Sequence, residues 1–550
     1  MTPTTLICAL TLALYLLRVL IRRVFSVLDN IPGPPRKSLL TGNITQFHDP
    51  DGWEFHADLA ESYGQVVKIY GLFGDRQLFV FDPVALHTIL VKERDTYEEE
   101  EQFMCLSGLI FGRGIFSTIR DEHRKYRKMM MPAFSTANLR EMLPIFYQVA
   151  ERGYGLIAPN LLDGPHTLDF NSIISRTSLE LIGRAGIGYS FDPMVHGQEQ
   201  TDRYAQAFRA LMPTAFKLGL LLPFLPLVLK IPFPSFHRFM LNLIPSATLH
   251  QARDIIDFTN ATAAQLVSDR KAAILNGELD ANDNAKDLMS ILMKGSMSSG
   301  DGLHLTDNEM VAAISMILFA GTDTTSSAMN RMFHILALHP DVQDKLRAEI
   351  LAAPEHMDHE TLNSALPYLD AVVREVLRLY PPPGPMSRIA FEDTIIPVST
   401  PIIGVDGTIM NTITVPKGTP IHIAISAANQ NKNVWGEDAL EFRPERWTNG
   451  KADSLTIKLC GVDGSTMTFL GGGRSCIGFK FAQLEMSGSL VHLRQLELKY
   501  LAEIVVCVLL RAFKFSSPDP RIKWRMNGLV AAPNVDNQPK LPILVEQLKT

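Results

Sequence analysis

Apolar residues recur at helical spacing along most of the middle of the chain. In residues 369–379 the apolar positions are Leu369, Val372, Val373, Val376 and Leu377, and three prolines follow from Pro381. Because proline cannot continue a helix, this pattern predicts a helix that ends before Pro381. A longer apolar segment, 310–319, follows Thr306 and Glu309, which have the spacing of a capping box. Helical patterns of this kind dominate residues 136–379.

Shorter segments with strand character lie on either side of the helical region. Residues 66–81 contain Gly71 and Gly74 at the place of a hairpin turn, and residues 394–425 contain a second turn at 415–419. The chain of 550 residues has no low-complexity linker and no internal repeat. The sequence therefore predicts a mainly α fold with a small β region, in one large domain over residues 31–550.

The N-terminus carries an apolar segment of its own. Residues 6–17 are apolar apart from Thr11, residues 19–21 extend the segment past Arg18, and Arg22 and Arg23 close it. Spanning a bilayer takes roughly 20 apolar residues, so the segment reaches across only if Arg18 snorkels or lies at the membrane interface. A secretory signal peptide is the alternative, but no basic residues precede the segment and no small-residue cleavage site follows it. We expect a transmembrane anchor in residues 1–30, with the arginines on the cytosolic side.

Charge and cysteine content narrow the class of protein further. The formal net charge is −6 and the pI is near 6.2, and no basic patch is interleaved with aromatic residues. Both observations argue against nucleic-acid binding. The five cysteines are odd in number and follow no regular spacing, which indicates a reducing compartment without a disulfide framework.

Residues 469–478 carry the most informative chemistry of the chain. Cys476 and Arg474 stand there among the glycines Gly471, Gly472, Gly473 and Gly478. Glycines allow backbone amides to approach a sulfur atom closely, and amides with a nearby cation lower the pKa of a thiol and favour the anion that binds metal. An inert thiol in a helix-entry loop is the alternative.

This decapeptide resembles the signature Phe-x-x-Gly-x-Arg-x-Cys-x-Gly of the cytochrome P450 family, in which a cysteine thiolate ligates haem iron. Phe469, Gly472, Arg474, Cys476 and Gly478 occupy all its fixed positions. The resemblance implies haem b as the cofactor and Cys476 as the axial ligand, whose electron donation favours O–O cleavage.

Four other segments also resemble the family, so that five matches lie between His123 and Gly478 in the family's order. The resemblance covers the chain after about residue 32. The resemblance gives Glu375, Arg378 and Arg446 a structural role in a buried network. It makes Thr324 a hydrogen-bond donor to dioxygen and Asp323 a proton relay, in a helical turn at Gly321 that we expect to be distorted. The residues expected to contact haem are His123, Arg127, Arg388, Phe469, Arg474 and Cys476, with the arginines opposite the propionates. His123 departs from the tryptophan that is commoner there.

The resemblance also implies the reaction and its partners. We expect a monooxygenase that inserts one oxygen atom from O2 into a lipophilic substrate. The chain has no Gly-x-Gly-x-x-Gly segment, so electrons must come from NADPH through a separate flavoprotein reductase. The alternatives are a family member that isomerises or dehydrates a substrate without O2, and a non-catalytic haem-binding relative.

The expected pocket segments, residues 97–117, 211–233, 381–387 and 527–532, are mostly apolar. Their prominent residues are Phe103, Ile110, Phe111, Ile115 and Phe116. A sterol, fatty acid or polyketide would suit them, and a terpenoid is the first expectation because the chain resembles fungal members. Residues 218–233 contain prolines and Lys230, which argue against a second spanning helix. The resemblance implies that this segment covers the active site and dips into the bilayer, while core packing is the alternative.

Residues 31–35, Ile-Pro-Gly-Pro-Pro, resemble the proline hinge of microsomal members. With the anchor, they imply a single-pass protein of the endoplasmic reticulum membrane whose catalytic domain is cytosolic. The sequons at Asn43 and Asn260 would then stay unused. One segment departs from the family pattern, residues 487–498, which we interpret as a splicing or gene-model error, with a true loop insertion as the alternative.

Overall fold

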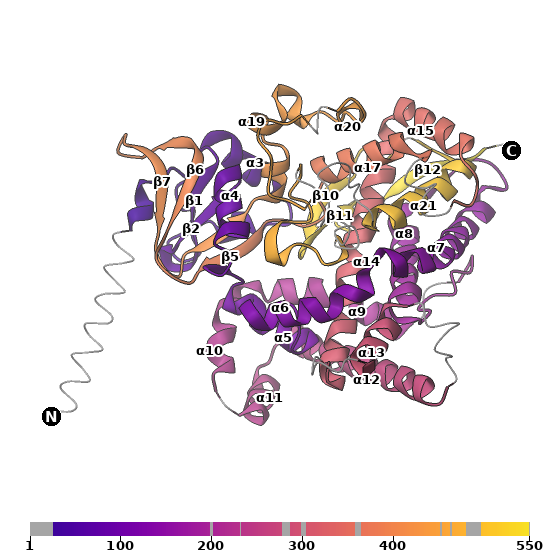
Figure 1. Ribbon diagram of the computed structural model, residues 1–550, viewed down its shortest axis with the longest axis horizontal. Coiled ribbons are helices and arrows are strands. Elements are labelled where there is room, and N and C mark those ends of the chain that lie inside the picture. The colour runs from indigo at the N-terminus through magenta and orange to yellow at the C-terminus, as the bar shows by residue number, and fades with distance from the viewer. Residues whose placement is uncertain are drawn as a thin grey trace. The chain divides into compact units, whose positions relative to one another are not determined.

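The structure is a computed structural model that describes residues 26–198, 202–231, 233–277, 287–298, 304–357, 365–450, 454–462, 465–479, 497–516 and 518–548. The chain divides into two compact units, drawn in Figure 1. Met1–Glu100 and Pro385–Asn431 form the first, here called the sheet unit. Glu101–Gly384 and Lys432–Thr550 form the second, the helical unit. The division into an anchor at residues 1–30 and one domain at residues 31–550 stays a prediction.

The sheet unit is built on five strands in the order β1 (Val66–Tyr70), β2 (Arg76–Val80), β8 (Pro420–Ile423), β5 (Met386–Ala390) and β3 (Tyr97–Glu98). β2 and β8 pair in parallel, with Val80 opposite Ile423, and the other pairs are antiparallel. A separate hairpin joins β6 (Thr394–Ile403) to β7 (Ile409–Val415). The helices of this unit are α2 (Ile44–Phe47), α3 (Trp53–Ser62), α4 (Pro83–His87) and α18 (Ile425–Asn429), with η1 (Val27–Asn30), η2 (Leu72–Gly74) and η3 (Thr88–Lys92).

Both turns predicted in the sheet unit are confirmed. β1 and β2 form a hairpin closed by η2, where Gly74 has a φ of +78°. The turn before β8 contains Gly418 with a φ of +87°. These are backbone conformations that glycine adopts at low cost, which is why turn residues could be recognised from the sequence.

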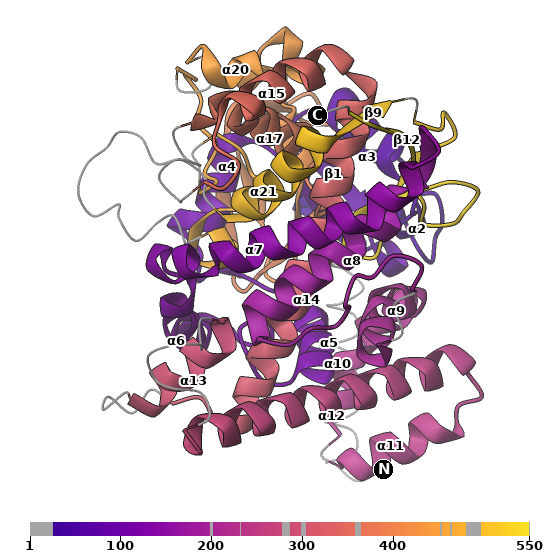
Figure 2. The ribbon, with the colours of Figure 1, turned by 90° about the vertical axis from the view of Figure 1, so that its right-hand side faces the viewer.

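α14 (Asp307–Leu338) lies at the centre of the helical unit, and α8 (Phe170–Ile182) and α12 (Ala247–Leu275) pack against it, as Figure 2 shows for α8. The predicted capping box begins α14: the Glu309 amide donates to Thr306 Oγ1 at 3.3 Å, and the Thr306 amide donates to Glu309 Oε2 at 2.8 Å. α17 (Pro367–Leu379) ends before Pro381 as predicted.

The other helices of this unit are α5 (Glu101–Phe111), α6 (Arg120–Met130), α7 (Thr136–Ile157), α9 (Arg203–Lys217), α10 (Leu225–Leu229), α11 (Pro234–Leu243), α13 (Leu288–Ser298), α15 (Pro340–Ala352), α19 (Lys432–Trp435), α20 (Glu445–Thr448) and α21 (Glu497–Ala512). Short 3-10 or π turns are η4 (Met131–Phe134), η5 (Ala158–Leu161), η6 (Gly183–Ile187), η7 (Gly219–Phe224), η8 (Glu437–Leu440) and η9 (Gly472–Arg474). Its strands are β4 (His166–Asp169), β12 (Pro542–Gln547) and β9 (Phe513–Ser516) in one sheet and β10 (Lys523–Asn527) with β11 (Val530–Asn534) in another. The fold is therefore mainly helical with small sheets, as predicted.

Two predictions fall largely outside the described residues. Residues 1–25 of the expected anchor are among those not described, and residues 26–30 contain η1. Within the described ranges no helix has the length and hydropathy needed to cross a bilayer. Residues 487–496 of the interpreted insertion also lie outside the description, which resumes at Glu497 with α21.

Candidate functional site

The loop around Cys476 has a backbone that its glycines make possible. Gly472 has a φ of +70°, and a Cβ on Gly471 would lie 1.8 Å from the carbonyl oxygen of Cys460. A side chain at Gly471 would therefore force the loop away from the neighbouring backbone. The Cys476 amide donates to the Phe469 carbonyl at 2.9 Å, and the Phe479 amide donates to the Cys476 carbonyl at 3.2 Å. These bonds close the loop around the sulfur atom.

The surroundings of the Cys476 sulfur include groups that favour the thiolate. Burial raises the pKa of the thiol, whereas hydrogen bonds from the Phe479 and Gly478 amides and the charge of Arg127 lower it. In the described part of the chain no cluster of His, Cys, Asp or Glu could hold a metal ion unaided. A single sulfur with amides directed at it suits an iron whose other ligands come from a macrocycle. The donor set therefore fits haem.

Arg127 connects α6 to the loop that carries Cys476. Its guanidinium donates to the Ser475 carbonyl at 2.7 Å and to Ser475 Oγ at 3.1 Å. Arg474 donates to the Thr118 carbonyl at 2.8 Å, just before α6 begins. His123 lies buried one turn before Arg127 on the same helix. The structure thus brings Arg127, Arg474 and Cys476 together, and the contacts with Ser475 and Thr118 were not predicted because they join residues distant in sequence.

Arg388 lies in the other compact unit, on β5. It is buried and forms an ion pair with Glu99 at 2.8 Å. A buried guanidinium needs such a partner to offset the loss of hydration. Its expected contact with a propionate remains a prediction.

Glu375, Arg378 and Arg446 lie together in the core of the helical unit. Arg378 donates two hydrogen bonds of 2.8 Å to the Glu375 carboxylate, and Arg446 donates one of 3.1 Å. Trp447 Nε1 also donates to Glu375, at 3.0 Å, and Arg446 pairs with Asp438 at 2.8 Å. The carboxylate is thus fully bonded, as a buried charge requires. Trp447 was missed because its partner Glu375 lies 72 residues away in the sequence. Asp438 was missed although it lies only 8 residues before Arg446, because no local motif marks the pair.

The turn of α14 at Gly321 is regular helix, which corrects the expected distortion. α14 continues unbroken through Asp323 and Thr324. The Thr324 hydroxyl donates to the Ala320 carbonyl at 2.6 Å, a bond that a regular helix tolerates. A Cβ on Gly321 would lie 2.6 Å from Ile182 Cδ1 on α8. The glycine is therefore needed for close helix packing rather than for a bend.

A hydrogen bond from α8 holds the same turn. The buried Ser178 hydroxyl donates to the Thr322 carbonyl at 2.8 Å. Next to it, burial raises the pKa of Asp323 to about 6, while the charge of Arg209 on α9 lowers it. A carboxyl group with a pKa near 6 exchanges protons readily at neutral pH, which is the property that a proton relay needs.

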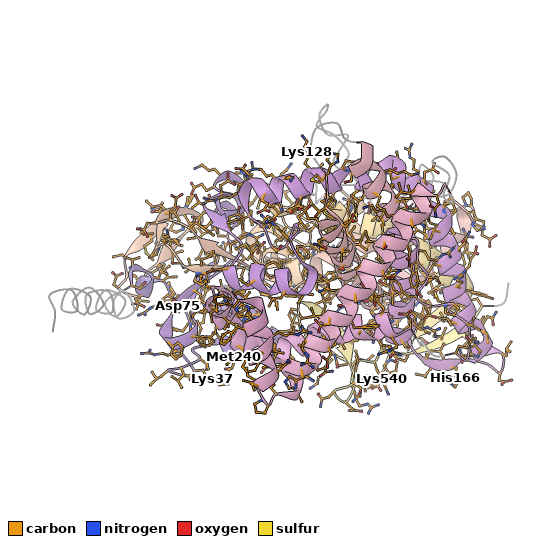
Figure 3. All side chains as sticks on the ribbon, turned by 90° about the horizontal axis from the view of Figure 1, so that it is seen from below. Lys37, Asp75, Lys128, His166, Met240 and Lys540 are labelled. Atoms are coloured by element: carbon orange, nitrogen blue, oxygen red, sulfur yellow. The ribbon has the colours of Figure 1, made fainter. Side chains whose placement is uncertain are left out.

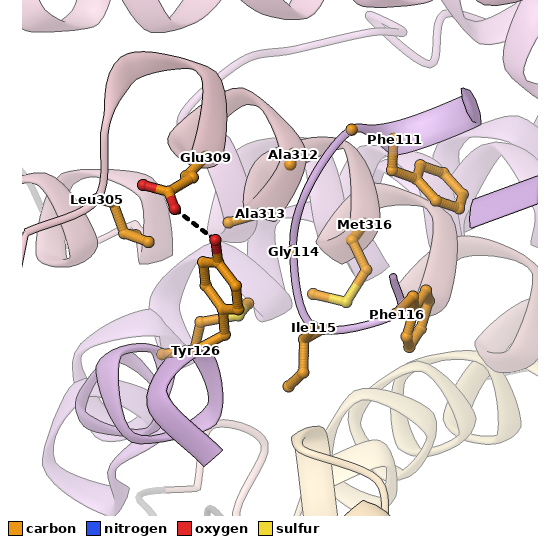
Figure 4. Close-up of a pocket in the computed structure, with 12 residues that line it drawn as sticks. Phe111, Gly114, Ile115, Phe116, Tyr126, Leu305, Glu309, Ala312, Ala313 and Met316 are labelled. Carbon is orange, nitrogen blue, oxygen red and sulfur yellow. Dashed lines mark hydrogen bonds between the residues drawn. The ribbon is translucent and has the colours of Figure 1, made fainter. Parts of the chain in front are cut away.

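An apolar pocket lies between α14, α6 and the loop that follows α5 (Figure 4). Five of its residues come from the predicted pocket segment 97–117: Phe111, Gly112, Gly114, Ile115 and Phe116. Residues from α14 and α6 complete the wall and were not predicted, among them Ala312, Ala313, Met316, Tyr126 and Met130.

The Tyr126 hydroxyl donates a short hydrogen bond to Glu309 at one end of this pocket (Figure 4). Burial raises the pKa of Glu309, but the hydrogen bonds from Tyr126 and Thr306 outweigh this effect and hold the pKa below its ordinary value. Tyr126 precedes Arg127 on α6, so this contact ties the start of α14 to the helix that contacts the Cys476 loop.

Comparison with known proteins gives a consistent result. The family model for cytochrome P450 matches residues 32–526. The chain is 43% identical to cytochrome P450 monooxygenase 91 of Postia placenta over 555 aligned residues, which cover 99% of this chain and 98% of that protein. It is 40% identical to cytochrome P450 monooxygenase 81 of the same fungus, over 98% of this chain and 96% of that protein. It is 35% identical to ganoderic acid synthetase CYP5150L8 of Ganoderma lucidum, over 96% of this chain and 94% of that protein.

Proposed function

This chain belongs to the cytochrome P450 family, and from this we propose that it inserts one oxygen atom of O2 into a lipophilic terpenoid. It is a haem-thiolate monooxygenase, and the observation that carries this function is the closed loop around Cys476. The amides directed at the sulfur and the charge of Arg127 suit a thiolate ligand.

The residues of the chain have distinct roles in this proposal. When bound, haem supplies the redox centre at which O2 is activated. Cys476 would ligate the iron, and the amides around it favour the anionic form of the sulfur against the effect of burial. The Thr324 hydroxyl, which donates to the Ala320 carbonyl, would be available to donate to dioxygen, and Asp323 would take up and release protons beside it. Within the helical unit, Arg127 and Arg474 would offer guanidinium groups to the propionates.

A lipophilic substrate is favoured by the pocket in Figure 4, whose lining is mainly aromatic and aliphatic. A terpenoid is favoured among lipophilic substrates by the name of a relative. One relative covered over nearly its whole length is named a ganoderic acid synthetase. The acid and alcohol side chains of Asp323 and Thr324 favour an oxygenase over an isomerase that needs no O2.

A separate NADPH-dependent flavoprotein reductase supplies the electrons in this proposal. Arg124, Lys125 and Lys128 are exposed on α6, and Lys128 extends from the surface in Figure 3. α6 is the helix that contacts the Cys476 loop through Arg127. An acidic surface of the reductase would therefore dock close to the ligand loop.

We place the protein in the endoplasmic reticulum membrane, with residues 1–30 as a single-pass anchor and the catalytic domain in the cytosol. A second lipid contact is proposed for residues 218–244. This region exposes Leu227 and Phe233, and on α11 Phe239, Met240 and Leu243 (Met240 is labelled in Figure 3). Exposed apolar residues gathered in one region are typical of membrane or protein contacts.

Turnover with isotopic oxygen tests the reaction. The full-length holoenzyme, reconstituted with a P450 reductase and NADPH, is incubated with fungal terpenoid extracts under 18O2. We expect a product that gains one 18O atom, and no product with Cys476→Ser. A product of unchanged oxygen content formed without O2 would support an isomerase. Normal haem content without substrate-dependent NADPH consumption would support a non-catalytic relative.

Deletion of residues 1–30 tests the location. We expect the shortened protein to move largely from the membrane pellet to the supernatant, since the anchor supplies most of the apolar contact. Complete retention in the pellet would point instead to residues 218–244 as the dominant contact.

A further inference from the structure

The Arg209 guanidinium on α9 carries a charge that the described chain does not pair. The side chain is half-buried and its Nη2 atom is fully buried, and no described residue accepts a hydrogen bond from that atom. Burial lowers the pKa of the guanidinium, and the charges of Asp323 and Asp192 oppose this only in part. Because an arginine keeps its charge in a protein, such a group destabilises the fold. A cost of this kind is typical of a functional site.

The two acidic residues whose charges reach Arg209 do not bond to it. Asp192 accepts hydrogen bonds of 2.6 and 2.9 Å from Arg176, and one of 2.8 Å from the Met194 amide. Asp323 acts on Arg209 through its charge alone, without a hydrogen bond between these two described residues. No acid of the described chain therefore takes the position at which a guanidinium binds both oxygens of a carboxylate.

Apolar residues flank Arg209 on the same helix. Leu211 packs in a buried cluster with Phe111 of α5, and Phe116 and Phe319 pack against that cluster. Phe111 and Phe116 also line the pocket in Figure 4, and Phe319 lies on α14 one turn before the proposed relay. A ligand with an apolar body against these aromatic rings and a negative charge at one end would match both features of α9.

We propose that the substrate is an apolar carboxylic acid whose carboxylate binds Arg209 while its hydrocarbon body lies against Phe111, Phe116 and Phe319. This inference rests on the proposed monooxygenase function and narrows its substrate from a lipophilic terpenoid to a terpenoid acid. The planar fork of a guanidinium matches the two oxygens of a carboxylate, and a charged pair is stronger than a bond to a neutral hydroxyl. A hydrocarbon or an ester of the same skeleton would leave the Arg209 charge uncompensated.

Binding at Arg209 would also determine which carbon of the substrate is oxidised. The charge of Arg209 acts on Asp323, so a bound carboxylate is held near the turn that carries Asp323 and Thr324. With one end fixed, the reacting carbon lies at a constant distance from the carboxylate. A neutral substrate has no such fixed end and would be oxidised at several positions.

Ligand binding to the full-length ferric holoenzyme in detergent tests this inference. Abietic, oleanolic and palmitic acids are compared, each with its methyl ester, by equilibrium dialysis at pH 7.5. We expect at least one acid to bind about tenfold more tightly than its ester. Arg209→Gln should remove this preference by weakening the acid alone, and Arg209→Lys should retain part of it because the charge is kept. Arg203→Gln is the matched control, since Arg203 is exposed on the same helix, and should bind like the wild type.

The outcomes separate the acid site from the reaction. Equal affinity for acid and ester in all three pairs, or no binding of any acid, would overturn the acid site. An equal loss of acid and ester in Arg209→Gln would also overturn it, because Arg209 would then support the pocket without binding a carboxylate. The dialysis needs neither O2 nor NADPH. A preference for the acid without incorporation of 18O during turnover would therefore contradict the proposed function and leave the acid site intact.

Discussion

The sulfur of Cys476 differs from that of its neighbour Cys460 through its hydrogen bonds. Burial raises the pKa of both thiols, that of Cys460 to about 12, and at Cys476 the amides of Gly478 and Phe479 and the charge of Arg127 oppose this rise. Cys460 therefore stays a protonated thiol at neutral pH. The two residues make a matched pair for testing ligation.

Replacing Cys476 with Ser should abolish the thiolate absorption band of the reduced carbon monoxide complex, because a neutral hydroxyl cannot donate electrons as the anion does. Cys460→Ser should keep that band at the wild-type intensity per haem. The measurement is the carbon monoxide difference spectrum of both purified variants. A wild-type band in Cys476→Ser would refute the ligand assignment.

The proton relay should show the influence of Arg209 on Asp323. With a pKa of about 6, Asp323 should give the ratio of product to NADPH an inflection near pH 6. A nearby positive charge favours the carboxylate, so Arg209→Gln should raise the pKa and move the inflection to higher pH. Asp323→Asn should remove the inflection. The profile is measured between pH 5 and pH 8, and identical profiles for all three proteins would exclude Asp323 from the relay.

Thr324 should couple electron flow to product formation. Thr324→Ala should keep haem content but divert reducing equivalents to hydrogen peroxide, since the hydroxyl donor is lost. Thr324→Ser retains a hydroxyl and should restore most of the wild-type ratio of product to NADPH. If Thr324→Ala kept the wild-type ratio, the hydroxyl would have no part in proton delivery.

Among the elements, the contact between α8 and α14 determines the position of the Asp323 turn. Ile182 packs on Gly321, and Ser178 donates to the Thr322 carbonyl. Both contacts come from a helix that carries none of the predicted site residues. α8 therefore holds the turn that carries Asp323 without contributing a residue to the proposed relay.

Ser178→Ala should lower both the free energy of unfolding and the ratio of product formed to NADPH consumed. Loss of a buried hydrogen bond costs about 1 kcal/mol, and amide exchange in the peptide over residues 318–328 should become faster. Ser172→Ala is the control, since Ser172 is exposed on the same helix. If Ser178→Ala had the same amide exchange rates and the same ratio of product to NADPH as Ser172→Ala, Ser178 would not hold the turn.

The elements that could be predicted from the sequence are those with local signals. The capping box at Thr306, the glycine turn at Gly74 and the end of α17 before Pro381 each depend on residues a few positions apart. Gly321 was interpreted as a bend because the sequence does not reveal Ile182 as its neighbour. Trp447 and Tyr126 were missed for the same reason: their partners, Glu375 and Glu309, lie more than 70 residues away. Family resemblance supplied the site residues, but their contacts required the fold.

At the scale of the whole molecule, buried histidines should make the fold sensitive to acid. Burial lowers the pKa of His56 to about 4 and that of His422 to about 3. Both lie in the sheet unit and contact the ring of Phe47. In the unfolded chain a histidine binds its proton near pH 6.5, so unfolding takes up protons below that pH.

The free energy of unfolding should therefore fall as the pH drops from about 6.5 toward 4. His56→Gln keeps a hydrogen-bonding side chain but cannot titrate, so its stability should depend less steeply on pH in this window. Urea unfolding at pH 7.5, 6.0 and 5.0 measures both slopes. Equal slopes for the wild type and His56→Gln would show that His56 remains able to take up a proton in the folded state.

The pairing of β2 with β8 has a consequence for synthesis of the chain. Their partners Val80 and Ile423 meet in parallel, although about 340 residues separate the two strands. At 5–20 residues per second, a ribosome needs roughly 20 to 70 s between making one and making the other. During that time β2 has an unpaired edge, which can pair with another nascent chain. Yield from a heterologous host should therefore depend on chaperones that cover the first hundred residues until translation nears its end.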